Sequence, residues 1–126
     1  MSAAYVDTSY VVGIAFDEPG TTGHMARLRS FETLMASNLL TAEFRSAQHR
    51  EKRSGRPAFL DRVRWILPDR DLDAEIERVF AAGYLRGANC WHLATALYLA
   101  EHVGAITFLT VDKRQQAIAR RLGFAT

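Results

Sequence analysis

The segment Ala4-Tyr5-Val6-Asp7-Thr8-Ser9 places a short apolar run directly before an acid and two hydroxyl residues. Such an apolar run predicts a buried strand, and the three polar residues are types that commonly cap the start of a helix. We therefore expect a strand over 4–6, followed at once by a helix over 10–16. This arrangement puts Asp7 at the carboxyl end of the first strand, where the chain turns into the helix.

The rest of the chain repeats this alternation of strand and helix. Further strands are predicted at 33–37, 65–67 and 106–110, and helices at 24–29, from Asn38 or Thr41 to about Arg53, and at 59–64, 71–82, 88–102 and 113–122. Because each crossover helix must pack back onto the sheet, this pattern predicts a parallel sheet covered on both faces. The expected fold class is α/β, a three-layer α/β/α sandwich with a short parallel sheet, built by a single domain over residues 1–126.

Four polar positions lie where a predicted element begins or ends: Asp7, Glu43, Asn89 and Asp112. Asp7 and Asp112 follow strands, while Glu43 and Asn89 are expected in the first turns of helices. Ligands of open parallel sheets bind beyond the carboxyl ends of the strands, so all four side chains can converge there. Mg2+ prefers hard oxygen ligands and is held by a few carboxylates together with substrate phosphates. The pattern therefore favours a metal-dependent nuclease, with these four residues as the candidate catalytic and metal-binding positions.

Asn89 carries an amide where a carboxylate would be expected. Its side chain has nearly the shape of aspartate and still offers an oxygen, but it removes one negative charge from the cluster. We therefore expect weaker metal binding than an aspartate would give. Three origins of the asparagine fit the sequence: an engineered inactivation, a natural degenerate homologue and a working one-metal site. A fourth interpretation is that Asn89 only caps its helix.

Charge is distributed unevenly along the chain, although the net charge is only +2. Residues 44–65 carry seven basic and two acidic side chains, whereas residues 1–43 carry two basic and five acidic ones. Arginine and lysine supply many of the contacts to nucleic-acid phosphates, so this basic belt is expected to attract a polyanion to the acidic site. The candidate RNA-binding residues are Arg45, Arg50, Lys52 and Arg53. The alternative is an ordinary solvated helix face.

Cys90 is the single cysteine, which excludes an internal disulfide and a cysteine-based zinc site. This usage fits a reducing compartment. The sequence shows no secretory signal pattern and no apolar run long enough to span a membrane. We therefore expect a cytoplasmic protein that does not bind membranes.

Four segments of the chain form an ordered set of motifs: Tyr5 to Ser9 (YVDTS), Leu40 to Phe44 (LTAEF), Arg86 to Ala96 (RGANCWHLATA) and Leu109 to Arg114 (LTVDKR). Together they resemble the successive motifs of a PIN domain, and more narrowly those of VapC-type toxins of bacterial toxin–antitoxin pairs. Each fragment is weak by itself, but the order and the coverage of the whole chain make the combination specific.

The resemblance implies a ribonuclease that depends on Mg2+ or Mn2+, commonly forms a homodimer and pairs with a small cognate antitoxin. By motif position, Asp7, Glu43 and Asp112 match the first, second and fourth acids of the family. Asn89 occupies the place of the third acid, which is normally aspartate. The hydroxyl positions that support the acids are matched by Thr8, Ser9 and Thr110.

Two hypotheses from different functional classes follow. The first is a metal-dependent endoribonuclease, the toxin of a toxin–antitoxin pair, weakened or inactivated by Asn89. The second is a catalytically silent module that binds RNA or an antitoxin on the same fold. They differ in whether Asn89→Asp produces RNA cleavage.

Overall fold

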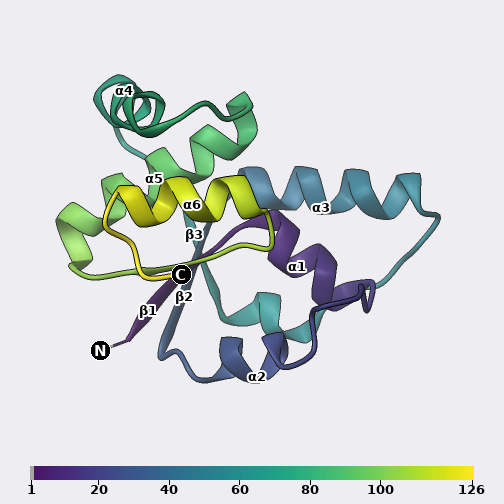
Figure 1. Cartoon of the computed structure of the whole chain (residues 1–126). Coiled ribbons are helices and arrows are strands. Elements are labelled where there is room, and N and C mark those ends of the chain that lie inside the picture. Colours follow the sequence, from purple (N-terminus) through teal and green to yellow (C-terminus); the bar gives the residue numbers. More distant parts are fainter. Residues whose placement is uncertain (1) are drawn as a thin grey trace.

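The computed structural model describes residues 2–126, and these residues form a four-stranded parallel sheet (Figure 1). The strands are β1 (Ala3–Val6), β2 (Thr33–Ser37), β3 (Val63–Ile66) and β4 (Thr107–Leu109), in the spatial order β3-β2-β1-β4. The register places Tyr5 of β1 opposite Met35 of β2 and Phe108 of β4. The predicted α/β class with a short parallel sheet is confirmed.

Helices cover both faces of this sheet and complete the predicted three layers. One face carries α1 (Thr8–Ala15), α2 (His24–Arg29), α3 (Leu39–Arg50) and the 3-10 helix η1 (Ala58–Arg62). The other face carries α4 (Asp73–Ala82), α5 (Gly87–Val103) and α6 (Lys113–Arg121). Within residues 2–126, no helix is long and apolar enough to cross a membrane.

The side chains of β1 explain why both faces must be covered. Successive residues of a strand point to opposite faces. Tyr5 packs into the core beneath α4, α5 and α6, whereas Ala4 and Val6 pack into the core beneath α1, α2 and α3. All four residues of β1 are buried. A strand that is apolar on both sides is stable only between two helical layers.

The strand order creates a switch point beside β1. The chain runs from β1 to β2 and β3 on one side, and then crosses to place β4 on the other side of β1. Ligands of open parallel sheets bind where the order reverses in this way, beyond the carboxyl ends of the strands. Asp7 follows β1 and Thr110 follows β4, so both lie at this point.

The segment before α4 differs from the prediction. The sequence pattern predicts a helix over 59–64 and a strand over 65–67, whereas the 3-10 helix ends at Arg62 and the strand already begins at Val63. Val63 is buried and lies opposite Leu34 of β2. Short apolar runs fit either helix or strand by periodicity alone, and here the pairing with β2 decides.

Helix α3 also differs at both ends from the prediction. It begins at Leu39, so Glu43 lies in its second turn and not in the first. It ends at Arg50, because Lys52 adopts a positive φ of 53° and the Arg53 amide donates to the Gln48 carbonyl at 2.8 Å. This is the hydrogen-bond pattern of a Schellman motif, which terminates the helix before the predicted Arg53.

Candidate functional site

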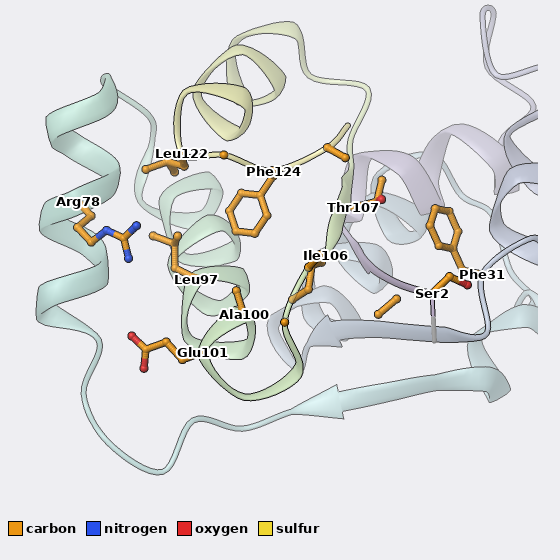
Figure 2. Close-up of a pocket in the computed structure, with 15 residues that line it drawn as sticks. Ser2, Phe31, Arg78, Leu97, Ala100, Glu101, Ile106, Thr107, Leu122 and Phe124 are labelled. Carbon is orange, nitrogen blue, oxygen red and sulfur yellow. The ribbon is translucent and has the colours of Figure 1, made fainter.

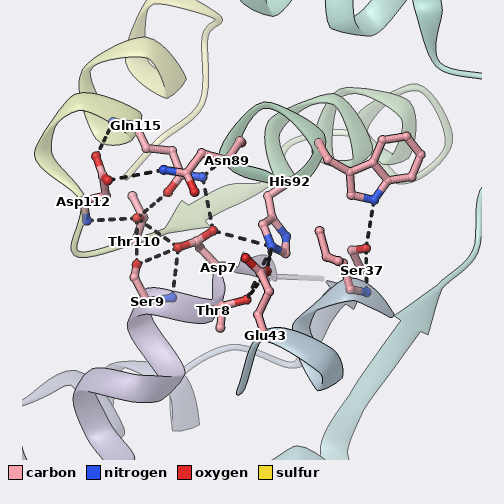
Figure 3. A network of polar contacts seen from close by, with 12 residues as sticks. Asp7, Thr8, Ser9, Ser37, Glu43, Asn89, His92, Thr110, Asp112 and Gln115 are labelled. Carbon is pink, nitrogen blue, oxygen red and sulfur yellow. Dashed lines mark hydrogen bonds and ion pairs between the residues drawn. The ribbon is translucent and has the colours of Figure 1, made fainter. Parts of the chain in front are cut away.

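A pocket of about 270 Å³ opens at the carboxyl ends of β1 and β4 (Figure 3). We call it the acidic pocket. It is lined by all four candidate metal-binding positions: Asp7, Glu43, Asn89 and Asp112. Asp7 and Asp112 are the N-cap residues of α1 and α6, and Asn89 lies in the first turn of α5. The fold thus brings four separate segments of the sequence to one place.

Asp7 is almost fully buried, at 3% exposure, and both of its carboxylate oxygens accept hydrogen bonds. Oδ2 accepts from the Ser9 amide at 3.0 Å and from the Ser9 hydroxyl at 2.6 Å, and the Thr110 hydroxyl oxygen lies 3.5 Å from it. Oδ1 accepts from Nε2 of Gln115 at 3.1 Å. Ser9 and Thr110 therefore lie where hydroxyls supporting the first acid are expected.

Asp112 and Asn89 form a direct pair in this pocket. Oδ1 of Asp112 caps α6 by accepting from the Gln115 amide at 2.8 Å, and Oδ2 accepts from Nδ2 of Asn89 at 3.3 Å. The side-chain amide of Asn89 therefore acts as a hydrogen-bond donor toward a carboxylate. An aspartate at this position would place a second negative charge there instead.

Glu43 is held by two hydrogen bonds to the same carboxylate oxygen. The Thr8 hydroxyl donates to Oε1 at 2.7 Å, and Nε2 of His92 lies 2.6 Å from that oxygen. Burial by itself would raise the pKa of Glu43, but the hydrogen bonds from His92 and Thr8, together with the electrostatic interaction with His92, lower the pKa below its usual value. Glu43 is therefore anionic at neutral pH, and Oε2 remains for a ligand.

His92 is fully buried and is fixed on its far side by Tyr5. The Tyr5 hydroxyl lies 2.7 Å from Nδ1 of His92 and accepts a hydrogen bond from the Ser37 amide at 3.1 Å. Burial raises the pKa of Tyr5 well above its usual value, so the hydroxyl keeps its proton and can donate it to Nδ1. The Tyr5 bond to Nδ1 leaves Nε2 of His92 directed at Glu43.

Gln115 is fully buried and connects Asp7 to the start of α5 at Asn89. Besides its bond to Asp7, its Nε2 donates to the Asn89 carbonyl at 3.2 Å, and its Oε1 accepts from the Thr110 hydroxyl at 2.6 Å. Sequence reasoning missed Gln115, as it missed the roles of His92 and Tyr5. The Asp112 amide donates to the Thr110 hydroxyl and not to the Gln115 side chain, so no capping-box signal could have indicated the role of Gln115.

Two further charged residues line the acidic pocket: Glu18, which the sequence did not predict, and Arg50, one of the candidate RNA-binding residues. Glu18 is exposed and comes from the loop after α1, where its amide donates to the Gly13 carbonyl at 2.9 Å. A Cβ at Gly13 would lie only 2.8 Å from Cγ2 of Thr21, so a larger residue there would force the Thr21 side chain to shift, and glycine favours this close packing of the loop on α1. The packing holds Glu18 beside the acids.

The four candidate RNA-binding residues do not lie together. Arg50 lines the acidic pocket and pairs with Glu51, its Nε lying 3.2 Å from Oε1. Arg45 and Arg53 line a different pocket on the other flank of α3, and Lys52 lines a third. The basic belt therefore surrounds α3 and reaches the acidic pocket only at Arg50.

The acidic pocket offers the donor types that suit a hard divalent cation, namely carboxylate and amide oxygens. Across residues 2–126, however, no three Asp, Glu, His or Cys side chains are grouped closely enough to hold a metal ion. An aspartate at position 89 would add a carboxylate beside Asp112. The chemical types of these donors therefore fit Mg2+ or Mn2+, and the neutral amide of Asn89 is the weakest of the four donors.

A larger pocket, of about 610 Å³, lies at the other end of the sheet, beside the first residues of β1 and β4 (Figure 2). Apolar side chains such as Leu97, Leu122 and Phe124 form much of its wall, and Arg78 and Glu101 are the charged residues that line it. Binding sites are recognised by convergent polar groups as well as by size. The dense polar network of the acidic pocket therefore identifies that pocket as the candidate functional site.

A comparison with protein-family models matches residues 4–121 to the PIN domain. The match includes β1 from residue 4, the other three strands and all four candidate metal-binding positions. No curated protein and no solved structure matched the chain. The parallel sheet with helices on both faces agrees with the family match. The chain belongs to the PIN domain family, whose fold is that of a nuclease.

Proposed function

We propose that this chain is a metal-dependent endoribonuclease, the toxin component of a VapBC-type toxin–antitoxin pair, whose activity is weakened by Asn89. The observation that carries the proposal is the convergence of Asp7, Glu43 and Asp112 with Asn89 in one pocket of a PIN domain. The resemblance of the ordered motifs to VapC-type toxins supports the narrower assignment.

In this proposal Asp7, Glu43 and Asp112 would hold Mg2+ or Mn2+, with the Asn89 side-chain oxygen as a fourth donor. When bound, such an ion polarises the phosphate and lowers the pKa of a water, which becomes a nucleophile at neutral pH. The surrounding residues keep the donors in place. Arg50 lies at the same pocket and supplies a positive charge for a phosphate of the RNA.

The hydrogen-bond network explains how the donors are held before any ligand arrives. Ser9 and Gln115 hold Asp7, Thr110 holds Gln115, and Thr8 and His92 hold Glu43. Supporting partners of this kind orient metal ligands, and their removal typically reduces metal affinity or activity by about 10–100-fold. The network therefore supports a site that is preorganised around its acids.

A second candidate function is a catalytically silent module that binds RNA or an antitoxin. The observation that favours it is the 3.3 Å hydrogen bond from Asn89 to Asp112. This bond satisfies an oxygen that a metal would otherwise use, and the amide removes one negative charge from the cluster. Under this alternative the acids serve to hold the fold together at the ends of β1 and β4.

Cleavage of a mixed-sequence single-stranded RNA separates the two candidates. The chain and its Asn89→Asp form are compared with Mn2+ and with EDTA, and Asp112→Asn in the Asn89→Asp background serves as the matched control. The nuclease proposal predicts cleavage by the Asn89→Asp form that EDTA and Asp112→Asn both abolish. Binding of RNA without cleavage by either form would favour the silent module.

The partners of this nuclease are also part of the proposal. We expect the chain to form a homodimer and to pair with a small antitoxin whose gene lies beside its own. We expect the pair to act in the cytoplasm, with RNA as the substrate of the chain. Expression of the Asn89→Asp form should arrest bacterial growth, and co-expression of the neighbouring small protein should relieve the arrest. Growth arrest that the neighbouring protein leaves unchanged would argue against the pairing.

A further inference from the structure

The pocket that Arg45 and Arg53 line has a volume of about 520 Å³ and lies on the flank of α3 that faces away from the acidic pocket. We call it the basic pocket. It forms because the segment after α3 folds back along the helix: Nε2 of Gln48 donates to the Gly55 carbonyl at 2.6 Å, and the Arg53 amide donates to the Gln48 carbonyl at 2.8 Å. These bonds give the pocket a defined wall.

The charged side chains that line the basic pocket are all basic. They are Arg45, Arg53 and Arg56, with His49 beside them and no carboxylate among the described residues of the lining. The Arg53 guanidinium lies over the Phe16 ring, 4.6 Å from its centroid, at the border with the neighbouring pocket that Phe16 lines, and Arg56 pairs with Asp61 outside the basic pocket. Arginines that face a pocket without a competing acid are well suited to bind phosphate.

The floor of the basic pocket is apolar and partly aromatic. Phe44 and Leu60 are buried there, and Trp65 is partly exposed. An accessible aromatic ring next to arginines is the arrangement on which proteins stack the bases of single-stranded nucleic acids. An acidic peptide would use the arginines but would leave the tryptophan without a flat partner.

The two pockets share α3, which explains how one strand of RNA can reach both. Glu43, Ala47 and Arg50 line the acidic pocket. The basic pocket is lined by the residues two positions before each of these, namely Thr41, Arg45 and Gln48. An offset of two residues corresponds to about 200° around a helix, so the two sets of side chains lie on nearly opposite sides of α3. A helix with its side chains is only about 10–12 Å across, so the two pockets are separated by about that distance.

We propose that the basic pocket binds a nucleotide of single-stranded RNA, with the base against Trp65 and the phosphate between Arg45 and Arg53. The inference rests on RNA as the ligand, as in the proposed function. It adds a site away from the acidic pocket that holds the strand on the far flank of α3. It also gives the basic belt a defined binding site in place of a diffuse attraction.

Binding of a fluorescein-labelled single-stranded oligouridylate tests this, with EDTA present so that nothing is cut. The variants are Arg45→Ala and Arg53→Ala, and the matched control is Arg64→Ala. Arg64 belongs to the same basic belt and precedes Trp65 in β3, so its side chain points to the opposite face of the sheet. We expect each pocket variant to weaken binding about 5-fold or more. The slope of log affinity against log salt concentration should fall by about 0.7 for each phosphate that is no longer neutralised.

Tryptophan fluorescence provides a second readout that does not depend on the arginines. The chain contains two tryptophans, Trp65 and Trp91. RNA should quench the emission, and Trp65→Phe should remove most of the quenching while it preserves binding, because phenylalanine still stacks. Quenching that persists in Trp65→Phe would overturn the placement of the base.

Several results would contradict the basic pocket as an RNA site. Equal weakening by Arg64→Ala and Arg45→Ala would show a diffuse electrostatic surface. Quenching by oligoglutamate but not by RNA would assign the pocket to an acidic protein segment. The nuclease function is tested separately. RNA binding at the basic pocket without cleavage by the Asn89→Asp form would contradict the nuclease function. Cleavage by the Asn89→Asp form, with RNA binding that Arg45→Ala does not alter, would contradict the basic pocket as an RNA site.

Discussion

Nε2 of His92 lies 2.6 Å from Oε1 of Glu43, although the two residues are 49 positions apart in the sequence. The imidazole is fully buried, so it stays in the orientation that the fold gives it. The hydrogen bond from Tyr5 to the other ring nitrogen prevents rotation of the ring without loss of a buried bond. His92 therefore acts as a positioning residue for Glu43.

Replacement of His92 should separate this positioning role from packing. A glutamine amide nitrogen reaches the place of Nε2, whereas an asparagine amide reaches only the place of Nδ1. In the Asn89→Asp background, we expect His92→Asn to reduce Mn2+-dependent RNA cleavage by about 10–100-fold and His92→Gln to retain most of it. Thermal melting of the two variants provides the control for folding. Equal activity of the two at equal stability would contradict the positioning role.

Gln115 should be important for stability because the side chain of this buried residue makes three hydrogen bonds. Gln115→Met keeps the length of the side chain but leaves Asp7 and Thr110 short of a partner. We expect the free energy of unfolding in urea to fall by about 1–3 kcal/mol. The neighbouring Gln116→Met is the matched control and should change little. A decrease no larger than that of Gln116→Met would show that the network contributes little to folding.

Glu18 should contribute to metal affinity from outside the predicted set of acids. It is an exposed residue at the acidic pocket, so its charge acts on the ion through partly screened attraction. We expect Glu18→Gln to weaken Mn2+ binding by about two- to five-fold in calorimetric titration. Asp17→Asn removes the same charge one residue away, at a position that does not line the pocket. Equal effects of the two variants would count against a local role for Glu18.

The ion pair of Arg70 and Glu75 should make the stability depend on pH. Arg70 donates to both oxygens of the buried Glu75, at 3.0 and 2.8 Å, and chiefly this bonding lowers the pKa of Glu75 below its usual value. Because the folded state binds the proton more weakly than the unfolded state, the pair stabilises the fold above the unfolded pKa. That stabilisation is lost as the pH falls through the folded pKa.

Glu75→Gln tests this dependence by urea denaturation at two pH values. At neutral pH we expect Glu75→Gln to lower the free energy of unfolding by about 1 kcal/mol, a modest effect because the Arg70 side chain is 44% exposed. Below the folded pKa of Glu75 the decrease should be much smaller. Glu77→Gln, at an exposed position of the same helix, should show neither effect. A decrease from Glu75→Gln that is the same at both pH values would mean that packing, and not charge, explains it.

The strands that could be predicted are those whose apolar runs end at acids or hydroxyls. The strand predicted over 4–6 lies within β1, and the strand predicted over 33–37 matches β2. Both could be predicted because both faces of these strands are buried and their sequences are mostly apolar. The strand at β3 was misplaced by two residues, because pairing with β2 and not local pattern sets its start. Register between strands is a property of the sheet that no single segment carries.

The site could be predicted in its acids but not in its supports. Asp7 and Asp112 lie as helix caps after apolar runs, which is a local signal. His92 lies on α5, which is buried on several sides, so helical periodicity does not tell which of its side chains faces the acids. Tyr5 has the sequence pattern of an ordinary core residue of β1. The bonds of these two residues join positions far apart in the chain, so they depend on the complete fold.

The most direct test of the account is the rate of RNA cleavage as a function of the residue at position 89. A fluorescent single-stranded RNA is incubated with Mn2+ and with the chain, its Asn89→Asp form or its Asn89→Ala form, at matched folded concentrations. We predict that aspartate gives the highest rate, asparagine a lower one and alanine the lowest, with EDTA stopping all three. Rates that are independent of position 89, or an aspartate form that does not cut while it binds Mn2+ and RNA, would contradict the acidic pocket as a nuclease site.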